Sequence, residues 1–106
     1  MSTYQVLDAL GDATRRQVLE QLRKGPAPVG RLAESLPISR PAVSQHLRVL
    51  EECGLVAHES VGTRNIYRVA PDGLKALRGW LDDFWATALD SFADYAEQDH
   101  ASGRQP

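Results

Sequence analysis

The sequence predicts a mainly helical fold in which four helices are followed by a two-stranded β-hairpin and one long helix. Three observations support it. Apolar residues recur at intervals of three and four through most of the chain, the period of an amphipathic helix. Residues 55–60 and 65–69 are instead rich in strand-forming side chains and flank the turn-forming residues 61–64. An apolar stripe then continues through residues 72–98, a helix of roughly 25 residues.

Length and composition indicate one globular domain. The chain has 106 residues, of which 42% are hydrophobic and 25% charged, and no apolar stretch approaches the length of a membrane span. The N-terminus lacks the basic and apolar regions of a secretory signal, and the single Cys53 cannot form an internal disulfide. We expect one domain over residues 1–106 in a reducing cytoplasm, with a frayed tail at residues 101–106.

The net charge of −2 hides two unlike halves. Residues 1–78 carry 11 Lys/Arg against 8 Asp/Glu, a balance of +3. Residues 79–106 carry only Arg104 against six acidic residues, a balance of −5. DNA responds to charge within a Debye length of about 8–10 Å, so an acidic last helix held away from the duplex is compatible with DNA binding.

The first two helices are bounded by breaking and capping residues. A short amphipathic helix within residues 1–10 is stopped by Gly11, and Asp12 then suits an N-cap. The second helix is expected over residues 13–24. Its apolar face consists of Val18, Leu19 and Leu22.

The third helix is short and the fourth is well marked at both ends. Pro28 suits a first helical turn, because a missing N–H costs nothing there, and Pro37 closes the third helix. Ser39 supplies an N-cap hydroxyl for the fourth helix, which runs to Cys53 with Gly54 as its C′ residue.

The fourth helix has two faces of different chemistry. At about 100° per residue, Val43, Leu47 and Leu50 lie within about 40° of one another and define a buried side. The opposite side carries small or polar groups and one arginine: Pro41, Ser44, Gln45 and Arg48.

This polar side suits entry into the major groove of DNA. Gln45 can pair with adenine or a phosphate, Arg48 with guanine or a phosphate, and Ser44 with either. In an isolated helix the same face would indicate only solvent exposure. A preceding short helix and a following basic hairpin are what a winged helix-turn-helix requires, and this context favours DNA recognition.

Other residues extend the expected DNA surface. Arg64 at the hairpin tip and Arg68 in the second strand suit phosphate or minor-groove contacts, and Ser39 and Arg40 suit a phosphate at the start of the fourth helix. His46 lies near the buried side, so helix packing and base contact both stay open for it. The candidate DNA-binding residues are Ser39, Arg40, Pro41, Ser44, Gln45, His46, Arg48, Arg64 and Arg68.

Three segments carry a family resemblance. LGDATRRQVLEQL, VGRLAESLPISRPAVSQHLRVLEECGLV and GTRNIYRV resemble the ArsR (arsenic-repressor-like) family of bacterial winged-helix repressors, and the resemblance covers residues 5 to about 85. It implies a symmetric dimer that sits on an inverted-repeat operator, blocks transcription and leaves when a ligand binds.

The resemblance departs from the metal-sensing members of this family. These carry a Cys-Val-Cys-like pair entering the third helix, where this chain has Pro28, Val29 and Gly30. Another family site pairs Asp and His across the last helices, but this last helix offers only His100 beside its aspartates. Cys53, expected on the packed side of its helix, cannot bind a soft metal alone. The resemblance therefore implies the non-metal-sensing branch, with no metal and no cofactor, and leaves an unidentified small-molecule inducer open.

The last helix predicts self-association. A helix of roughly 25 residues spans about 37 Å, more than the expected core covers. Pairing with a second copy would cover the stripe; the alternative is packing of its first half within the chain. The candidate dimer-interface residues are Tyr4, Leu7, Leu81, Phe84, Trp85, Ala88 and Phe92.

The function predicted is a sequence-specific, double-stranded DNA-binding transcription regulator, a homodimeric repressor. Two alternatives stay open: a metal- or small-ligand-gated sensor of the same fold, and a winged-helix module for protein–protein assembly. An enzyme is not expected, because the sequence has no Gly-rich phosphate loop and no nucleophile elbow, and its histidines are spread over separate elements.

Overall fold

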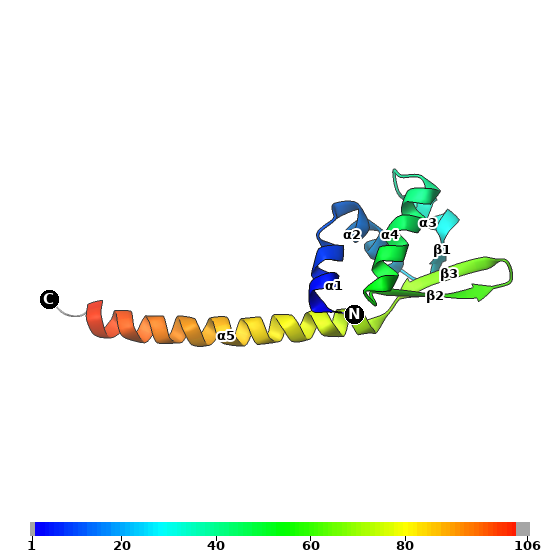
Figure 1. Cartoon of the computed structure of the whole chain (residues 1–106). Helices are drawn as coiled ribbons and strands as arrows, with labels where there is room; N and C mark the ends of the chain where they lie inside the picture. The colour runs from blue at the N-terminus through cyan, green and yellow to red at the C-terminus, as the bar shows by residue number, and fades with distance from the viewer. Residues whose placement is uncertain (1, 104–106) are drawn as a thin grey trace.

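The computed structural model describes residues 2–103, and the side chains of residues 2–98. A body of four helices and a small sheet carries one long helix that projects from it, so that the molecule measures 74 × 25 × 20 Å (Figure 1). The elements in chain order are α1 (Thr3–Leu10), α2 (Ala13–Arg23), β1 (Ala27–Pro28), α3 (Val29–Ser35), α4 (Arg40–Glu52), β2 (Val56–Val61), β3 (Arg64–Val69) and α5 (Pro71–Gly103). The predicted fold class is confirmed: four helices, a hairpin and a long last helix.

The sheet contains a third strand that the sequence did not predict. Its order is β1-β3-β2, and antiparallel β1 pairs Ala27 with Tyr67 and Pro28 with Ile66. Pro28, predicted within the first turn of a helix, is instead the extended residue before α3, with φ −78° and ψ 163°. An edge strand tolerates proline because its missing N–H is not needed for the ladder.

The hairpin is tighter than predicted. Its loop has two residues, Gly62 and Thr63, because Val61 and Arg64 pair as the last residues of the strands. Gly62 has φ +66°, and a positive φ at the first loop position is the requirement of a type II′ turn, which glycine meets without steric cost.

Helix α5 is longer than predicted. It has 33 residues, and its backbone is helical through Gly103, beyond the predicted end at residue 98; the frayed tail expected at residues 101–106 stays a prediction. The reason is that neither Gly nor Pro occurs between Gly79 and Gly103. Residues 104–106, and the side chain of His100, lie outside the described part of the chain.

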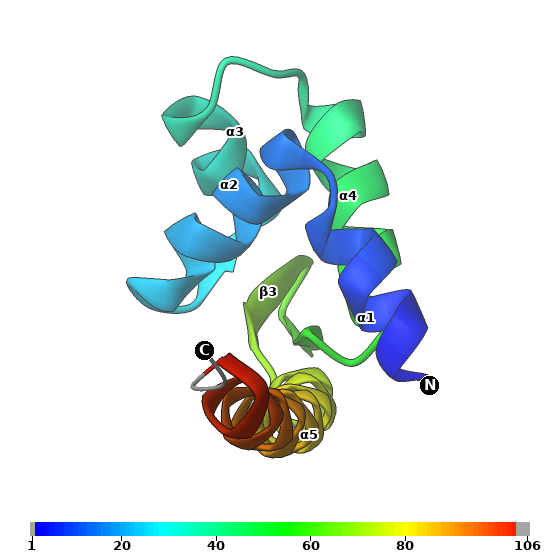
Figure 2. The same cartoon turned by 90° about the vertical axis from the view of Figure 1, so that its left-hand side faces the viewer.

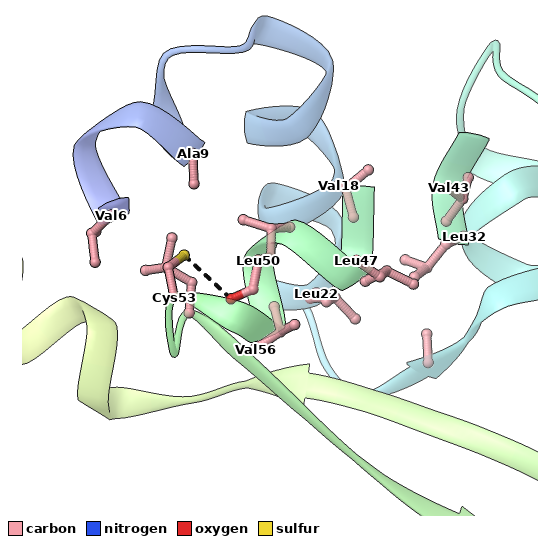
Figure 3. Packing of buried hydrophobic residues seen from close by; sticks show 12 residues of the cluster. Val6, Ala9, Val18, Leu22, Leu32, Val43, Leu47, Leu50, Cys53 and Val56 are labelled. Atoms are coloured by element: carbon pink, nitrogen blue, oxygen red, sulfur yellow. Dashed lines mark hydrogen bonds between the residues drawn. The ribbon is translucent and has the colours of Figure 1, made fainter. Parts of the chain in front are cut away.

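The core lies between the four helices α1 to α4, strand β1 and the root of the hairpin (Figure 3). Val43, Leu47 and Leu50, predicted to be the buried side of α4, are 0% exposed, and this prediction is confirmed. Cys53 is also buried, and its Sγ donates to the carbonyl oxygen of Leu50 at 3.4 Å. A core on one side of α4 leaves its opposite side facing outward.

Both ends of α4 are fixed by the residues the sequence indicated. The Ser39 hydroxyl accepts the N–H of Ala42 at 3.3 Å. At the other end Gly54 has φ +77°, and the N–H groups of Gly54 and Leu55 donate to the carbonyls of Glu51 and Leu50. These two bonds form a Schellman motif, which ends the helix and turns the chain into the hairpin.

The start of α5 is locked against the end of α4. The N–H of Gly73 donates to the Gly54 carbonyl at 2.8 Å, and the N–H of Ala70 donates to the Leu55 carbonyl at 2.9 Å. A β-carbon at Gly73 would lie 2.8 Å from the Cys53 oxygen and 2.9 Å from the Gly54 carbonyl carbon, closer than side chains approach backbone. Helix α1 packs against α5 (Figure 2), beside the first part of that helix (Figure 1).

Candidate nucleic-acid interface

The predicted recognition face of α4 is exposed. Pro41, Ser44, Gln45 and Arg48 all face outward from the helix. Because the buried side of α4 fixes the rotation of the helix about its own axis, these four side chains all project to the same side of the molecule.

Arg48 has a partner that the sequence reading did not identify. Its Nε lies 3.3 Å from Oε1 of Glu52, one turn further along the same exposed face. The two side chains are 79% and 65% exposed, so the pair contributes at most about 1 kcal/mol. Glu52 therefore orients the guanidinium without preventing it from reaching a base.

The N-terminus of α4 offers fewer backbone donors than an ordinary helix. Pro41 has no N–H, the N–H of Ala42 is satisfied by Ser39, and that of Val43 donates to the Ser39 carbonyl. A phosphate at this end would therefore depend on the Arg40 side chain, the Arg40 N–H and the Ser39 hydroxyl hydrogen, rather than on the helix terminus as a whole.

His46 lies on the boundary between the two faces of α4. Its side chain is half-buried, and it is close to the start of α2. The Arg15 N–H, hydrogen-bonded at 2.9 Å, lowers the pKa of Asp12 below its ordinary value, and the charges of Arg15 and His46 lower it further. Half burial is compatible with helix packing and with a base contact, so both roles stay open for His46.

The hairpin presents two arginines on one side. Arg64 is the first residue of β3, directly after the loop, and Arg68 follows four residues later; both are exposed. Since side chains alternate along a strand, both point away from the side on which Tyr67 and Val69 pack against the core. The tip position expected for Arg64 is confirmed.

A hydrogen bond joins the hairpin to α4. Nδ1 of His58 in β2 lies 2.6 Å from Oε2 of Glu51, and the His58 and Tyr67 rings have centroids 5.0 Å apart. Burial raises the pKa of Tyr67, and the Glu51 charge adds to the increase. These contacts fix the hairpin relative to the outward face of α4. Sequence reasoning missed them, because Glu51 and His58 lie on different elements.

A hollow of about 510 Å³ lies between α3, the start of α4 and the hairpin tip. Residues 28–31, Glu34, Arg40 and residues 63–65 line it. It brings together Arg40 and Arg64, which the sequence placed in separate contacts, and adds Arg31, which the sequence reading did not single out.

The predicted dimer face is uncovered in the single chain. Apolar residues of α5 stay 40–69% exposed: Leu74, Leu81, Phe84, Trp85, Leu89, Phe92 and Tyr95. Ala88 is also exposed, and Tyr4 of α1 is 69% exposed, whereas Leu7 is half-buried. Packing of α5 within the chain reaches Leu77 but does not cover the stripe beyond it.

No group of three or more His, Cys, Asp or Glu side chains that could hold a metal occurs among the described residues. Burial raises the pKa of the Cys53 thiol, which disfavours the thiolate that would bind a metal. No helix in the described part of the chain is long and apolar enough to cross a membrane.

Comparison with known proteins gives consistent similarities. The model of the family described as "Bacterial regulatory protein, arsR family" matches residues 12–58. The chain is 50% identical over 103 residues to the HTH-type transcriptional regulator Rv2034 of Mycobacterium tuberculosis, covering 93% of this chain and 96% of that protein. It is 30% identical over 79 residues to the transcriptional repressor SdpR of Bacillus subtilis, covering 74% of this chain and 88% of SdpR.

One of the similar solved structures is a homodimer. The homodimeric winged helix-turn-helix DNA-binding domain Mb0332 from Mycobacterium bovis superposes with a TM-score of 0.62 at 25% identity. The match covers 97% of this chain and 84% of that one.

Proposed function

The chain belongs to the ArsR family of bacterial transcriptional regulators, and from this premise we propose that it is a homodimeric repressor that binds an inverted-repeat operator. The family and the named relatives make it a DNA-binding regulator. Repression, dimer geometry and the contact residues are the proposal. The observation that carries it is the exposed polar face of α4, held outward by a fully buried opposite side and flanked by an arginine-bearing hairpin.

Base recognition is assigned to the exposed face of α4. The amide of Gln45 has the donor and acceptor needed for a bidentate contact with adenine, and the guanidinium of Arg48 those for guanine. Ser44 supports a contact to either a base or a phosphate. The Arg48–Glu52 pair must open or rotate, which costs little at this exposure.

Backbone contacts are assigned to the hairpin and the start of α4. Arg64 and Arg68 point from one side of the hairpin, and the Glu51–His58 bond holds that side at a set angle to α4. Such contacts position the protein on the duplex and contribute affinity that does not depend on sequence.

Pairing is assigned to the exposed apolar stripe of α5, together with Tyr4 and Leu7 of α1. The similar Mycobacterium bovis domain is homodimeric, and uncovered aromatic side chains such as Phe84, Trp85 and Phe92 are typical of an interface. Charges favour antiparallel helices, because the early part of α5 carries Lys75 and Arg78 whereas the later part is acidic.

The chain is proposed to belong to the members that do not sense metal through thiolates. Pro28, Val29 and Gly30 occupy the positions where metal-sensing relatives would carry cysteines, and the thiol of Cys53 is buried. Release from DNA is then assigned to a small-molecule inducer. As a DNA-bound regulator the protein would act in the bacterial cytoplasm.

The test measures operator affinity by fluorescence anisotropy on the protein's own promoter region and on a scrambled duplex of equal length. The double variant Gln45→Ala/Arg48→Ala should lose about 1–3 kcal/mol per removed base contact on the operator and little on scrambled DNA. The matched control is Gln17→Ala/Arg23→Ala on α2, because Arg23 pairs with Glu20 at 3.2 Å much as Arg48 pairs with Glu52.

Three results would contradict parts of this proposal. Unchanged operator affinity in the α4 double variant would refute the assigned recognition face. Equal binding of wild-type protein to both duplexes would favour the assembly-module alternative. Operator binding that a chelator abolishes or enhances would favour the metal-gated alternative.

A further inference from the structure

We infer that the hollow between α3, α4 and the hairpin tip is a site for a phosphate group, occupied by one backbone phosphate of the bound DNA. The inference rests on the proposed function, since it assumes that α4 enters the major groove. It adds Arg31 as a contact residue and Gly30 as a positioning residue, neither of which belongs to the recognition face.

The charge of the hollow is strongly positive. Arg31, Arg40 and Arg64 line it together with one carboxylate, Glu34. None of the three arginines has a carboxylate within 4.0 Å in the part of the chain that the structure describes. Other arginines do have such partners: Arg15, Arg23, Arg48 and Arg78. The hollow therefore gathers guanidinium groups that are free to bind an external anion.

The Arg40 side chain has a specific seat. A β-carbon at Gly30 would lie 3.2 Å from one terminal nitrogen of Arg40 and 3.4 Å from its guanidinium carbon. The guanidinium thus lies close to the backbone of α3. A methyl group at position 30 would require this exposed side chain to shift by a few tenths of an ångström, whereas a larger side chain would occupy its place. Gly30 consequently places Arg40 inside the hollow, beside Arg31 and Arg64.

The geometry of DNA selects the occupant. The major and minor grooves are separated by one sugar–phosphate strand. With α4 in the major groove and the hairpin tip at the adjacent minor groove, that strand must cross the gap between the start of α4 and Arg64. The hollow occupies this gap. Guanidinium groups form paired hydrogen bonds with the oxygens of a phosphate, so the site and the strand are chemically matched.

The test measures the dependence of the DNA association constant on salt for Arg31→Ala and Gly30→Ala. Each lost phosphate contact lowers the slope of log K against log salt by about 0.9. Arg31→Ala should lower the slope by about that amount and weaken binding similarly on operator and scrambled DNA. Gly30→Ala, which removes no charge and requires the Arg40 guanidinium to shift by only a few tenths of an ångström, should lower the slope by less than Arg31→Ala. The controls are Arg23→Ala and Gly79→Ala, which change the same residue types outside the hollow.

A free phosphate group shares this chemistry, so a second arm measures the melting temperature of each variant with and without inorganic phosphate. If the slopes do not change but phosphate stabilises wild type and not Arg31→Ala, DNA is overturned as the occupant and a free phosphate takes its place. If neither quantity responds to Arg31→Ala, the phosphate site itself is refuted. Equal affinity of wild-type protein for operator and scrambled DNA would instead refute the proposed function. The melting temperatures with and without inorganic phosphate would still show whether the hollow binds a phosphate group.

Discussion

Two glycines of the same helix are expected to respond oppositely to alanine. Gly73, in the first turn of α5, is buried against the end of α4, whereas a β-carbon at Gly79 would meet no atom within 4 Å. Both positions lie within α5, so both should gain the helix propensity of alanine, about 1 kcal/mol over glycine. The difference between the two variants therefore isolates the contact at Gly73.

The magnitude at Gly73 follows from its neighbours. The new methyl group would lie 2.8–2.9 Å from the carbonyl groups of Cys53 and Gly54, which are backbone and cannot rotate away. Overpacking of this kind costs about 1–3 kcal/mol. The displaced Gly73 N–H also weakens its 2.8 Å bond to Gly54, a further loss of about 1 kcal/mol. After the propensity gain, Gly73→Ala should destabilise the protein by about 1–3 kcal/mol, and Gly79→Ala should stabilise it by up to about 1 kcal/mol.

The assay is thermal unfolding followed by circular dichroism at one fixed protein concentration, because a dimer's melting temperature depends on concentration. At about 4–8 °C per kcal/mol for a domain of this size, Gly73→Ala should melt at least about 4 °C below wild type. Gly79→Ala should melt at or above it. Equal shifts of both variants in the same direction would refute the close contact between α5 and the end of α4.

Three further predictions concern the buried thiol, the dimer and pH. Because its side chain is 3% exposed and burial raises its pKa, Cys53 should react with iodoacetamide more slowly in folded than in urea-unfolded protein, as followed by mass spectrometry. Equal rates would place the thiol at the surface. Trp85→Arg should remove about 3–6 kcal/mol of apolar burial from a pair of chains, weaken dimerisation by about 100-fold or more and halve the mass seen by light scattering. Asp83→Arg, on the opposite face of α5, should leave the mass measured by light scattering unchanged. A wild-type protein that is monomeric in the same measurement would contradict the assigned interface. The pKa of Asp12 is lowered in the folded state, so the charged carboxylate stabilises the fold at pH values above the ordinary pKa of an aspartate. This stabilisation is lost as the pH falls through the pKa that Asp12 has in the folded protein. The melting temperature of wild type relative to Asp12→Asn should therefore decrease between about pH 6 and pH 3, and a constant difference would argue against the cap.

Sequence patterns predicted the elements whose signals are local. Helix α4 is bounded by Ser39 and Gly54, and its apolar residues recur with the helical period, so both its limits and its buried side could be predicted. The hairpin could be placed for the same reason. The end of α5 could not, because no residue before Gly103 interrupts the helix, and the two residues of β1 are too few to show any period.

The candidate site was harder to predict where it depends on contacts between elements. The exposed face of α4 follows from periodicity alone. The Glu51–His58 bond, by contrast, joins residues whose spacing along the chain indicates nothing about their separation in space. The grouping of Arg31, Arg40 and Arg64 needs three elements to converge, and the seat at Gly30 is visible only once α3 and α4 are packed.

The start of α5 is fixed to the body of the protein, so a change in the angle of α5 is transmitted to that body. Only Ala70 separates β3 from α5, and the Gly73–Gly54 bond ties that junction to the end of α4. A helix of 33 residues is about 50 Å long, so a tilt of about 5° at its root moves its far end by about 4 Å. In a dimer paired along α5, the same tilt turns each DNA-reading body relative to its twin, while the operator holds its half-sites at a fixed pitch of about 34 Å. A molecule that changes the angle between the two α5 helices of such a dimer would release the protein from its operator without contacting a DNA-binding residue.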